Sequence, residues 1–571
     1  HSLRLLCLCL LLTACTAITV PSKSTLTPRP SVTTPVTAIP SEPTLTPTTT
    51  STPAPTPTPA PRTLTLCLGS EPESLYYYHA TSYAARFVLE AIYDGPTDVV
   101  DYTYRPVILE KLPSLADGDA LIETVYADTG DRVVDNEGKV VTLEEGTLIR
   151  PAGCRADDCL VTFEGTSQAM DRMRVIFKLK PDLRWSDGEP LTASDSVYSY
   201  NLARAPETPK GKWLELRTED YVAQDDLTVV WTGLPGYLDP EYVTAFWTPL
   251  PEHAWQSYPA SELLEQRAVS RTPLGYGPYV VQTWIPRQYI QVLPNPHYFR
   301  KQEDLPFFDE ITFRFLNNQD VDTALDALEN GRCDMLSLDL YLERDIARLQ
   351  EMENTGKAKL YAYPSTVLEQ LAFNVAPPPD YDRPPFFADT RTRQAVAACI
   401  NRQRIVDDVL YGLSTVPDLY VSPDHPLYTA LGTQHAFDPE QGKALLDEVG
   451  WRDENGDGVR EAHGVTGIPE GSQFQVQYIL NTGEIPQQVG LLVAADLAEC
   501  GIQADIEALD TEELFQDGPD SVLSGRRFDM VEFAWFTGVI PQCEMYLSTE
   551  IPSAENQWDG QNFSGYINPA Y

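Results

Sequence analysis

Alternating polar and apolar residues predict two strands in the body of the chain. Residues 63–68 alternate in this way and are followed by Gly69. Residues 173–180 also alternate, with one face formed by Met173, Val175, Phe177 and Leu179. A period of two is typical of a strand with one buried face. We therefore expect a half-buried strand at each place.

Two later segments follow the helical period of about 3.6 residues. Asp389 precedes the first, which carries Val396, Ile400 and Ile405 and is predicted to end at Gly412. The second begins at Asp438-Pro439-Glu440, an N-cap followed by proline and an acidic first turn, and stops at Gly450. A further helix is expected after Thr192. Helices and strands interleave through residues 310–535, which favours mixed α/β layers.

The N-terminal residues predict an export signal with a lipid attachment site. Residues 5–12 form an apolar run of eight, far below the ~20 residues that a membrane-spanning helix needs. Such a run suits the apolar region of a signal peptide. The segment Leu12–Cys15 resembles a bacterial lipobox, in which cleavage precedes the cysteine and the cysteine is acylated. We expect residues 1–14 to be a signal peptide, preceded by a few further residues, and Cys15 to carry the lipid.

Residues 15–62 are predicted to form a disordered stalk. Between residues 21 and 61 the chain has 12 Pro and 13 Thr. These residues bury too little apolar surface to offset the entropy of ordering the chain, and proline favours extended backbone. The stalk would hold a globular module away from the membrane.

The net charge excludes one class of partner. The chain has 571 residues and a formal charge of −42. Residues 1–62 contain four basic residues and one acidic residue, so the folded body carries −45. An acidic surface does not neutralise phosphates, so we expect no nucleic-acid partner and no membrane contact apart from the lipid. Neutral or cationic solutes are weakly favoured.

Motifs for hydrolytic chemistry are missing from the sequence. The seven His show no H-E-x-x-H spacing, and no G-x-S-x-G, P-loop or S-x-x-K motif occurs. A pair of catalytic carboxylates could still hide among the 83 acidic residues, which are more simply a solvated surface. We predict that the chain is not an enzyme, with an exported hydrolase as the remote alternative.

Five blocks, in order along the chain, resemble the large solute-binding proteins of peptide-type ABC importers, the oligopeptide, dipeptide and nickel-binding group. The most diagnostic block is residues 177–200, with the sequence FKLKPDLRWSDGEPLTASDSVYSY. The others are residues 64–75, 273–299, 373–395 and 437–458. The resemblance implies an α/β, two-lobed periplasmic-binding-protein-like fold of type II with an extra subdomain. Such proteins hold a solute between lobes that close around it.

The resemblance also implies domain boundaries and partners. Lobe I would span residues 64–365 with an inserted subdomain near 95–265, and lobe II would span residues 366–571. The segment that returns to lobe I in the family is expected to be absent. The partners would be a peptide or another small solute and the subunits of an ABC permease. We expect an exported monomer, lipid-anchored to the outer face of the cell membrane, without a cofactor. A solute sensor that serves no transporter is an alternative.

Candidate solute-binding residues come from three places in the matched blocks. Phe373 and Asn374 lie near the crossover between the lobes. The other candidates are Trp535, Phe536 and Thr537 in lobe II and Glu71, Tyr77 and Tyr78 after the first strand. For each aromatic residue, ordinary core packing is the alternative. The run Tyr76–Tyr78 cannot bury all three rings on one strand face, so at least one ring is expected in a cleft or at the surface.

One candidate position departs from the family pattern. Peptide-binding relatives hold the peptide's ammonium group with an Asp shortly after the tryptophan that Trp535 matches. Gln542 stands where we expect that Asp, and Glu544 nearby does not match its position. A neutral amide does not compensate a buried ammonium charge as a carboxylate does. Oligosaccharides, modified peptides and other neutral solutes therefore remain open as ligands.

The cysteines and one acidic loop complete the candidate sites. The resemblance implies a disulfide between Cys67 and Cys333, and the polar loop PAGCRADDC suggests a local one between Cys154 and Cys159. Cys399 and Cys500 are expected to be buried thiols. With Cys543 this makes seven cysteines after Cys15, so at least one is unpaired in a monomer.

The loop contains Asp453, Asn455 and Asp457, spaced as at the start of an EF-hand-like calcium site. Glu461 could add an oxygen ligand, but Gly464 occupies the place of the usual bidentate Glu. A solvated turn without metal is therefore the more favoured interpretation of this loop.

Overall fold

The structure is a computed structural model of the whole chain, and its description covers most of the chain after residue 59. The described residues are 60–317, 320–340, 342–363, 365–429, 435–516, 518–542, 544–554, 556, 558 and 560–568. The predicted signal peptide, Cys15 and nearly all of the stalk lie outside these residues, as does Cys543.

Lobe I is built on a five-stranded sheet. Its strand β1 (Thr63–Leu68) has the bounds predicted from the alternating pattern and lies between two parallel neighbours. The sheet order is β12 (Tyr279–Ile285), β13 (Tyr289–Pro294), β14 (Glu310–Phe315), β1 and β15 (Met335–Leu336). Helices α1 (Tyr83–Ile92), α6 (Val321–Glu329) and α7 (Ile346–Asn354) belong to this lobe. The apolar face of β1 packs into its core.

A second sheet in lobe I forms the extra subdomain. Its order is β10 (Thr218–Ala223), β11 (Thr228–Gly233), β9 (Gln168–Lys178) and β4 (Ala120–Ala127). The strand predicted at 173–180 is the second half of β9. The helix expected after Thr192 is α2 (Ala193–Arg204), and Thr192 and Asp195 cap it reciprocally. The subdomain boundaries near residues 95 and 265 stay a prediction.

Lobe II contains the third sheet, which is mixed. Its order is β16 (Val367–Phe373), β21 (Met530–Phe536), β19 (Gln475–Asn481) and β20 (Gln503–Leu509). Helices α8 (Thr390–Cys399), α10 (Pro439–Val449) and α11 (Glu484–Glu499) cover it. The predicted caps of α10 are confirmed, because the Asp438 side chain accepts from Gln441 N–H and Gly450 is left-handed.

The prediction of one helix from Asp389 to Gly412 is wrong, because two helices stand there. Helix α8 ends at Cys399, and α9 (Arg402–Asp408) begins after Asn401. The Asn401 side chain accepts from Arg404 N–H at 3.0 Å, and its own N–H donates to Asp496 at 2.9 Å. These bonds give the backbone groups of Asn401 and Arg404 partners outside a continuous helix. The apolar period continues across the break, which is why the sequence pattern hid it.

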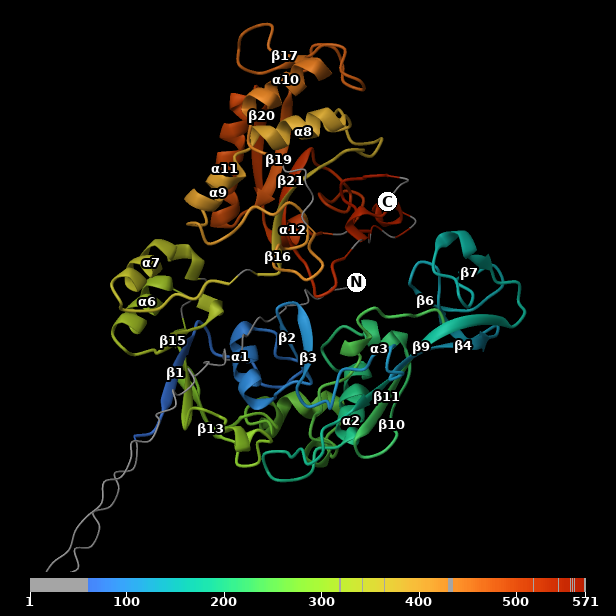
Figure 1. Cartoon of the computed structure of the whole chain (residues 1–571), viewed down its shortest axis with the longest axis vertical. Helices are drawn as coiled ribbons and strands as arrows, with labels where there is room; N and C mark the ends of the chain where they lie inside the picture. The colour runs from blue at the N-terminus through green and yellow to red at the C-terminus, as the bar shows by residue number, and fades with distance from the viewer. Residues whose placement is uncertain are drawn as a thin grey trace, which may run out of the picture.

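Figure 1 shows lobe II above lobe I, with the chain crossing from α7 to β16 between them. The α/β, two-lobed fold is therefore as predicted. Among the described residues, a ring contact and a hydrogen bond bridge the lobes. The Tyr102 and His425 rings lie 4.6 Å apart, and Gln350 Nε2 donates to the Tyr411 carbonyl at 3.3 Å. Within the described part of the chain, no helix has both the length and the apolar character that crossing a membrane requires.

Within the described residues, three disulfides cross-link the chain, each inside one lobe. Cys67–Cys333 joins β1 to the segment before β15, and Cys154–Cys159 closes a loop in the subdomain, both as predicted. The expectation that Cys399 and Cys500 are free thiols is wrong, because they form a third disulfide. Each cysteine stands at the C-terminal end of its helix, and the packing of α8 against α11 brings the two ends together. They are nevertheless buried, as expected.

Candidate functional site

The end of β21 carries three of the predicted solute-binding residues. Trp535 and Phe536 are partly exposed, whereas Thr537 is buried. The Trp535 ring is held edge-on by Phe533 and Phe563. Thr537 donates twice to the Thr366 carbonyl, through its N–H at 2.7 Å and through its hydroxyl at 2.9 Å. The strand end is therefore fixed to the crossover segment, with two aromatic side chains partly open to solvent.

Phe373 and Asn374 have structural roles at the other end of the neighbouring strand. Phe373 stacks on Phe387 and packs against the core of lobe II. Asn374 is 3% exposed, and its amide donates to the carbonyls of Arg526 and Phe528 at 2.9 and 3.0 Å. Neither residue lies beside Trp535, because the antiparallel register of β16 and β21 pairs Phe373 with Met530.

The three lobe I candidates are also engaged within their own lobe. Glu71 accepts from Trp284 Nε1 at 2.7 Å and from Arg287 N–H at 2.8 Å. The Tyr77 hydroxyl bonds Thr248, and the Tyr78 hydroxyl bonds Ser199. Tyr77 is the one ring of Tyr76–Tyr78 that stays partly exposed, because these residues form a turn that packs the other two inward.

Gln542 is exposed in the loop after β21. The structure does not test whether Gln542 takes the place of the ammonium-binding Asp that the resemblance implies.

Sequence reasoning missed a polar depression in lobe II. One hollow of about 530 Å³ is lined by Arg383, Gln477, Asp505, Ile506 and Glu507. A second, of about 800 Å³, continues from Arg383 toward Asn455 and Glu461. Arg383 donates to Asp529 Oδ2 at 2.6 Å, and burial raises the pKa of Asp529 while Arg383 opposes the rise. The only sign of this depression in the sequence is Arg383, which stands among the prolines of residues 377–385. That segment has no periodic pattern from which its place in the fold could be predicted.

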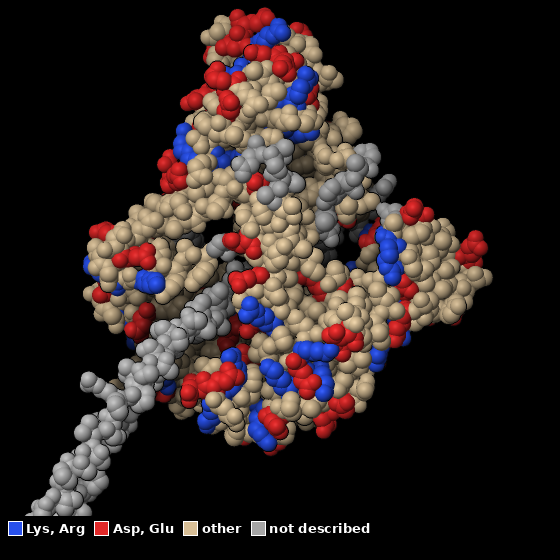
Figure 2. Space-filling model, in the orientation of Figure 1, with Lys and Arg blue, Asp and Glu red and all other residues tan. Residues whose placement is uncertain are grey.

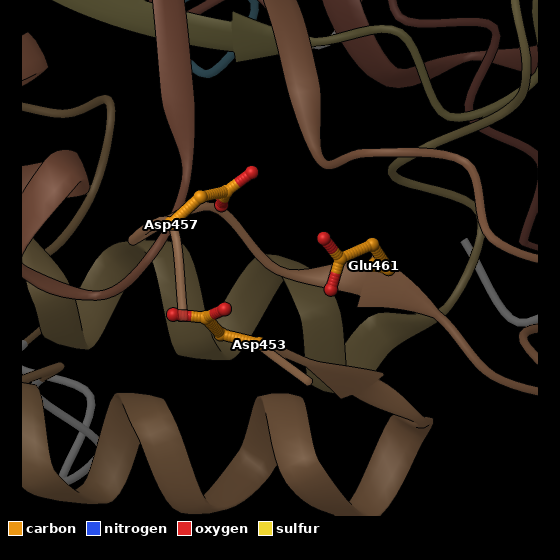
Figure 3. A group of neighbouring side chains, drawn as sticks. All are labelled: Asp453, Asp457 and Glu461. Atoms are coloured by element: carbon orange, nitrogen blue, oxygen red, sulfur yellow. The ribbon is translucent and has the colours of Figure 1, made fainter. Parts of the chain in front are cut away.

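The candidate calcium loop brings three carboxylates together (Figure 3). Oxygens of Asp453, Asp457 and Glu461 lie within 4.8 Å of one another, between β17 (Trp451–Arg452) and β18 (Glu461–Ala462). Each already accepts hydrogen bonds from the loop: Asp453 from Gly456 N–H, Asp457 from Val459 N–H, Glu461 from Glu454 N–H. Asn455 turns its amide nitrogen, not its oxygen, toward Glu461. These bonds within the loop stabilise the turn, and calcium binding there stays the less favoured of the two interpretations.

A buried carboxyl group lies in β21 itself. Glu532 is 2% exposed, and its Oε2 accepts from the Tyr478 hydroxyl. Burial raises the pKa of Glu532 to about 8, against the hydrogen bond from Tyr478 and with a further rise from the charge of Glu369. A carboxyl group with a raised pKa stays protonated in the folded state at pH values where the unfolded chain is ionised. Stability should therefore fall as the pH rises from about 4.5 to 8.

We expect Glu532→Gln to remove the contribution of Glu532 to this pH dependence. Gln keeps the shape and the acceptor for Tyr478 but has no charge to bury. At pH 8 the variant should be more stable than the wild type by on the order of 2 kcal/mol, and at pH 5 the two should be nearly equal. Urea denaturation from pH 5 to 8 measures this. Glu499→Gln, at an exposed glutamate at the end of α11, is the matched control. Parallel pH profiles of the wild type and Glu532→Gln would contradict the prediction.

Comparison with known proteins decides the family. The model for bacterial extracellular solute-binding proteins, family 5 middle region, matches residues 163–555, which include the crossover, lobe II and much of the subdomain. The chain belongs to this family of solute-binding proteins. Among the relatives is the oligopeptide-binding protein AppA of Bacillus subtilis, 23% identical over 394 residues and covering 66% of each chain. The nickel-binding periplasmic protein of Escherichia coli is 25% identical, over 59% of this chain and 60% of its own.

The match covers about half the length of the Brucella relatives. A Brucella ovis protein named for peptide binding in an ABC transporter is 28% identical over 290 residues, which are 50% of this chain and 51% of its own. Solved structures extend the likeness of the fold. AppA with a nonapeptide has a TM-score of 0.52 at 20% identity, covering 90% of this chain and 86% of its own. HbpA2 from Haemophilus parasuis has a TM-score of 0.61 at 16% identity, over 89% and 86%.

Proposed function

We propose that this chain captures a peptide or a similar small solute between its lobes and delivers it to an ABC permease. The observation that carries the proposal is the end of β21, where Trp535 and Phe536 are partly exposed next to the crossover segment. A partly exposed aromatic side chain beside the joint of two lobes supplies apolar contact area to whatever lies between them. As consecutive residues of a strand, Trp535 and Phe536 offer one such side chain on each face of β21. Relatives whose names state peptide binding support the same class of solute.

Solute capture by this geometry needs no chemical step. Each lobe is held internally by a disulfide and by its own core, and among the described residues the contacts between the lobes are few. Binding energy would therefore be used to bring two rigid bodies together, as in hinge-type closure. The closed form is the one that a permease would recognise.

The family and the N-terminal residues support a location outside the cytoplasm with a lipid anchor. Family 5 proteins act outside the cytoplasm, as the family description states. We infer that acylation of Cys15 anchors the chain and that the Thr/Pro-rich stalk holds the lobes above the membrane. Acidic side chains are spread over both lobes in Figure 2, and an anionic membrane would repel them.

One observation favours a second class of solute. Gln542 is neutral and exposed at the position where the resemblance implies an ammonium-binding Asp. Because an amide compensates a buried cation poorly, a neutral solute such as an oligosaccharide fits this residue better than a free peptide N-terminus.

Mass spectrometry of small molecules released from the purified full chain tests the proposal. After denaturation we expect a peptide or another small solute at close to one equivalent per chain. Mixed peptides would favour the first class and a single neutral solute the second. Absence of a released solute, together with no rise in melting temperature on addition of a peptide mixture, would contradict solute capture.

A further inference from the structure

A hairpin of lobe I carries a strained aromatic residue at its tip. Strands β2 (Thr97–Val100) and β3 (Thr103–Pro106) are joined by the two residues Asp101 and Tyr102. Both have positive φ, at 50° and 56°. Two-residue turns of this kind favour Asn and Gly, because a side chain with a Cβ is disfavoured in the left-handed region. Tyr102, at the second position of the turn, therefore has an unfavourable backbone conformation.

The Tyr102 hydroxyl adds a second unfavourable feature. It is shielded from solvent, and it has no hydrogen-bond partner among the described residues. A buried polar atom without a partner destabilises the folded state. A residue with two such features requires a compensating contact, since backbone strain persists only where the surroundings hold it in place.

The contact that Tyr102 makes is with the other lobe. Its ring lies 4.6 Å from the His425 ring, at an angle of 58°. His425 belongs to lobe II and is 4% exposed. The Leu427 N–H donates to His425 Nδ1 at 3.0 Å, so Nε2 carries the hydrogen and donates to the Val539 carbonyl at 2.9 Å. Val539 lies in the loop that follows β21, three residues after Phe536. His425 is therefore bonded to the loop next to Trp535 and Phe536.

We propose that Tyr102 is a positioning residue for the solute site: from lobe I, its ring fixes His425 and, through His425, the Val539 loop beside Trp535 and Phe536. The hairpin tip thus couples the approach of the lobes to the shape of the solute-contacting segment. The effect on solute affinity rests on the proposed function, whereas the contact between the lobes does not.

Hydrogen exchange of the chain without solute tests the contact. In Tyr102→Ala, amides of residues 417–429 and 537–540 in lobe II should exchange roughly 2- to 12-fold faster, the range that one aromatic pair contributes. Tyr102→Phe keeps the ring and removes the unpartnered hydroxyl, so exchange should equal the wild-type rate or be slower. Tyr102→Gly relieves the strained turn, so the hairpin itself should keep its protection while the lobe II segments lose theirs.

Solute binding gives the second readout. Titration with the solute recovered from the purified protein should show a similar 2- to 12-fold loss of affinity in Tyr102→Ala and wild-type affinity in Tyr102→Phe. Tyr126→Ala, a tyrosine of the subdomain that is 73% exposed, is the control and should change neither measurement. Wild-type exchange rates in lobe II of Tyr102→Ala, or a Phe variant that behaves like Ala, would overturn the proposal. Unchanged affinity with altered exchange would overturn its functional part.

Failure of the proposed function has a different signature. It would appear as a wild-type chain that binds no solute, and the exchange comparison would still decide whether Tyr102 holds His425.

Discussion

Replacing Cys399 and Cys500 by Ala should destabilise lobe II by about 4 kcal/mol. Their disulfide closes a segment of 101 residues, and a cross-link over so long a loop removes much of the entropy of the unfolded chain. The two residues are 0% and 1% exposed, so the substitution also removes packed sulfur atoms from the core. Denaturation followed by hydrogen exchange in β19 and α11 measures lobe II separately from lobe I.

The short disulfide of the subdomain is the matched comparison. Cys154 and Cys159 are only five residues apart, so their bridge restricts the unfolded chain less, by about 2 kcal/mol on the same model. Replacing both with Ala should therefore cost less and should leave lobe II unchanged. If the Cys399/Cys500 variant lost less than the Cys154/Cys159 variant, the structural role given to the third disulfide would be wrong.

The second large effect is expected for Gly277→Ala in lobe I. Gly277 donates its N–H to the Ile92 carbonyl at 2.6 Å, at the C-terminal end of α1. A Cβ at this position would lie 2.5 Å from that oxygen and 2.8 Å from the Tyr93 nitrogen. These backbone atoms can move away only if the end of α1 moves. We therefore expect the free energy of unfolding to fall by about 3 kcal/mol. Chemical denaturation monitored by exchange in α1 gives the value.

Gly211→Ala provides the control for this substitution. A Cβ at Gly211 meets no atom within 4 Å, so its effect should lie within about 0.5 kcal/mol. Equal stability of the Gly277 and Gly211 variants would contradict the steric argument. Gly277 lies in the block of residues 273–299 that carries the family resemblance, and the chain there passes directly against the end of α1.

Local pattern was sufficient to predict individual elements where one residue type decides the structure. Strand β1 and the caps of α10 follow from alternation and from Asp438 and Gly450, and all lie where predicted. The division between α8 and α9 was missed because it depends on the bond from Asn401 to Asp496, 95 residues away. The Cys399–Cys500 disulfide was missed for the same reason, since pairing is set by how two helices pack.

The solute site depends even more on contacts between residues that are far apart in the sequence. Trp535 and Phe536 were identified through the family blocks, and the structure leaves them partly exposed. Glu71 and Asn374 come from the same blocks, but their polar atoms serve the folded lobes. The contact between Tyr102 and His425 joins residues more than 300 positions apart, and no pattern in either segment indicates the other.

Solute titration of Trp535→Ala tests whether the chain captures its solute at the end of β21. Using the solute recovered from the purified protein, calorimetry should show affinity at least tenfold weaker than wild type, because a Trp in contact with a ligand typically contributes strongly to binding. Trp213→Ala, an exposed tryptophan of the subdomain, should bind as the wild type does. Affinity for the solute should fall in the Trp535 variant alone. Wild-type affinity in Trp535→Ala would contradict solute capture at the end of β21.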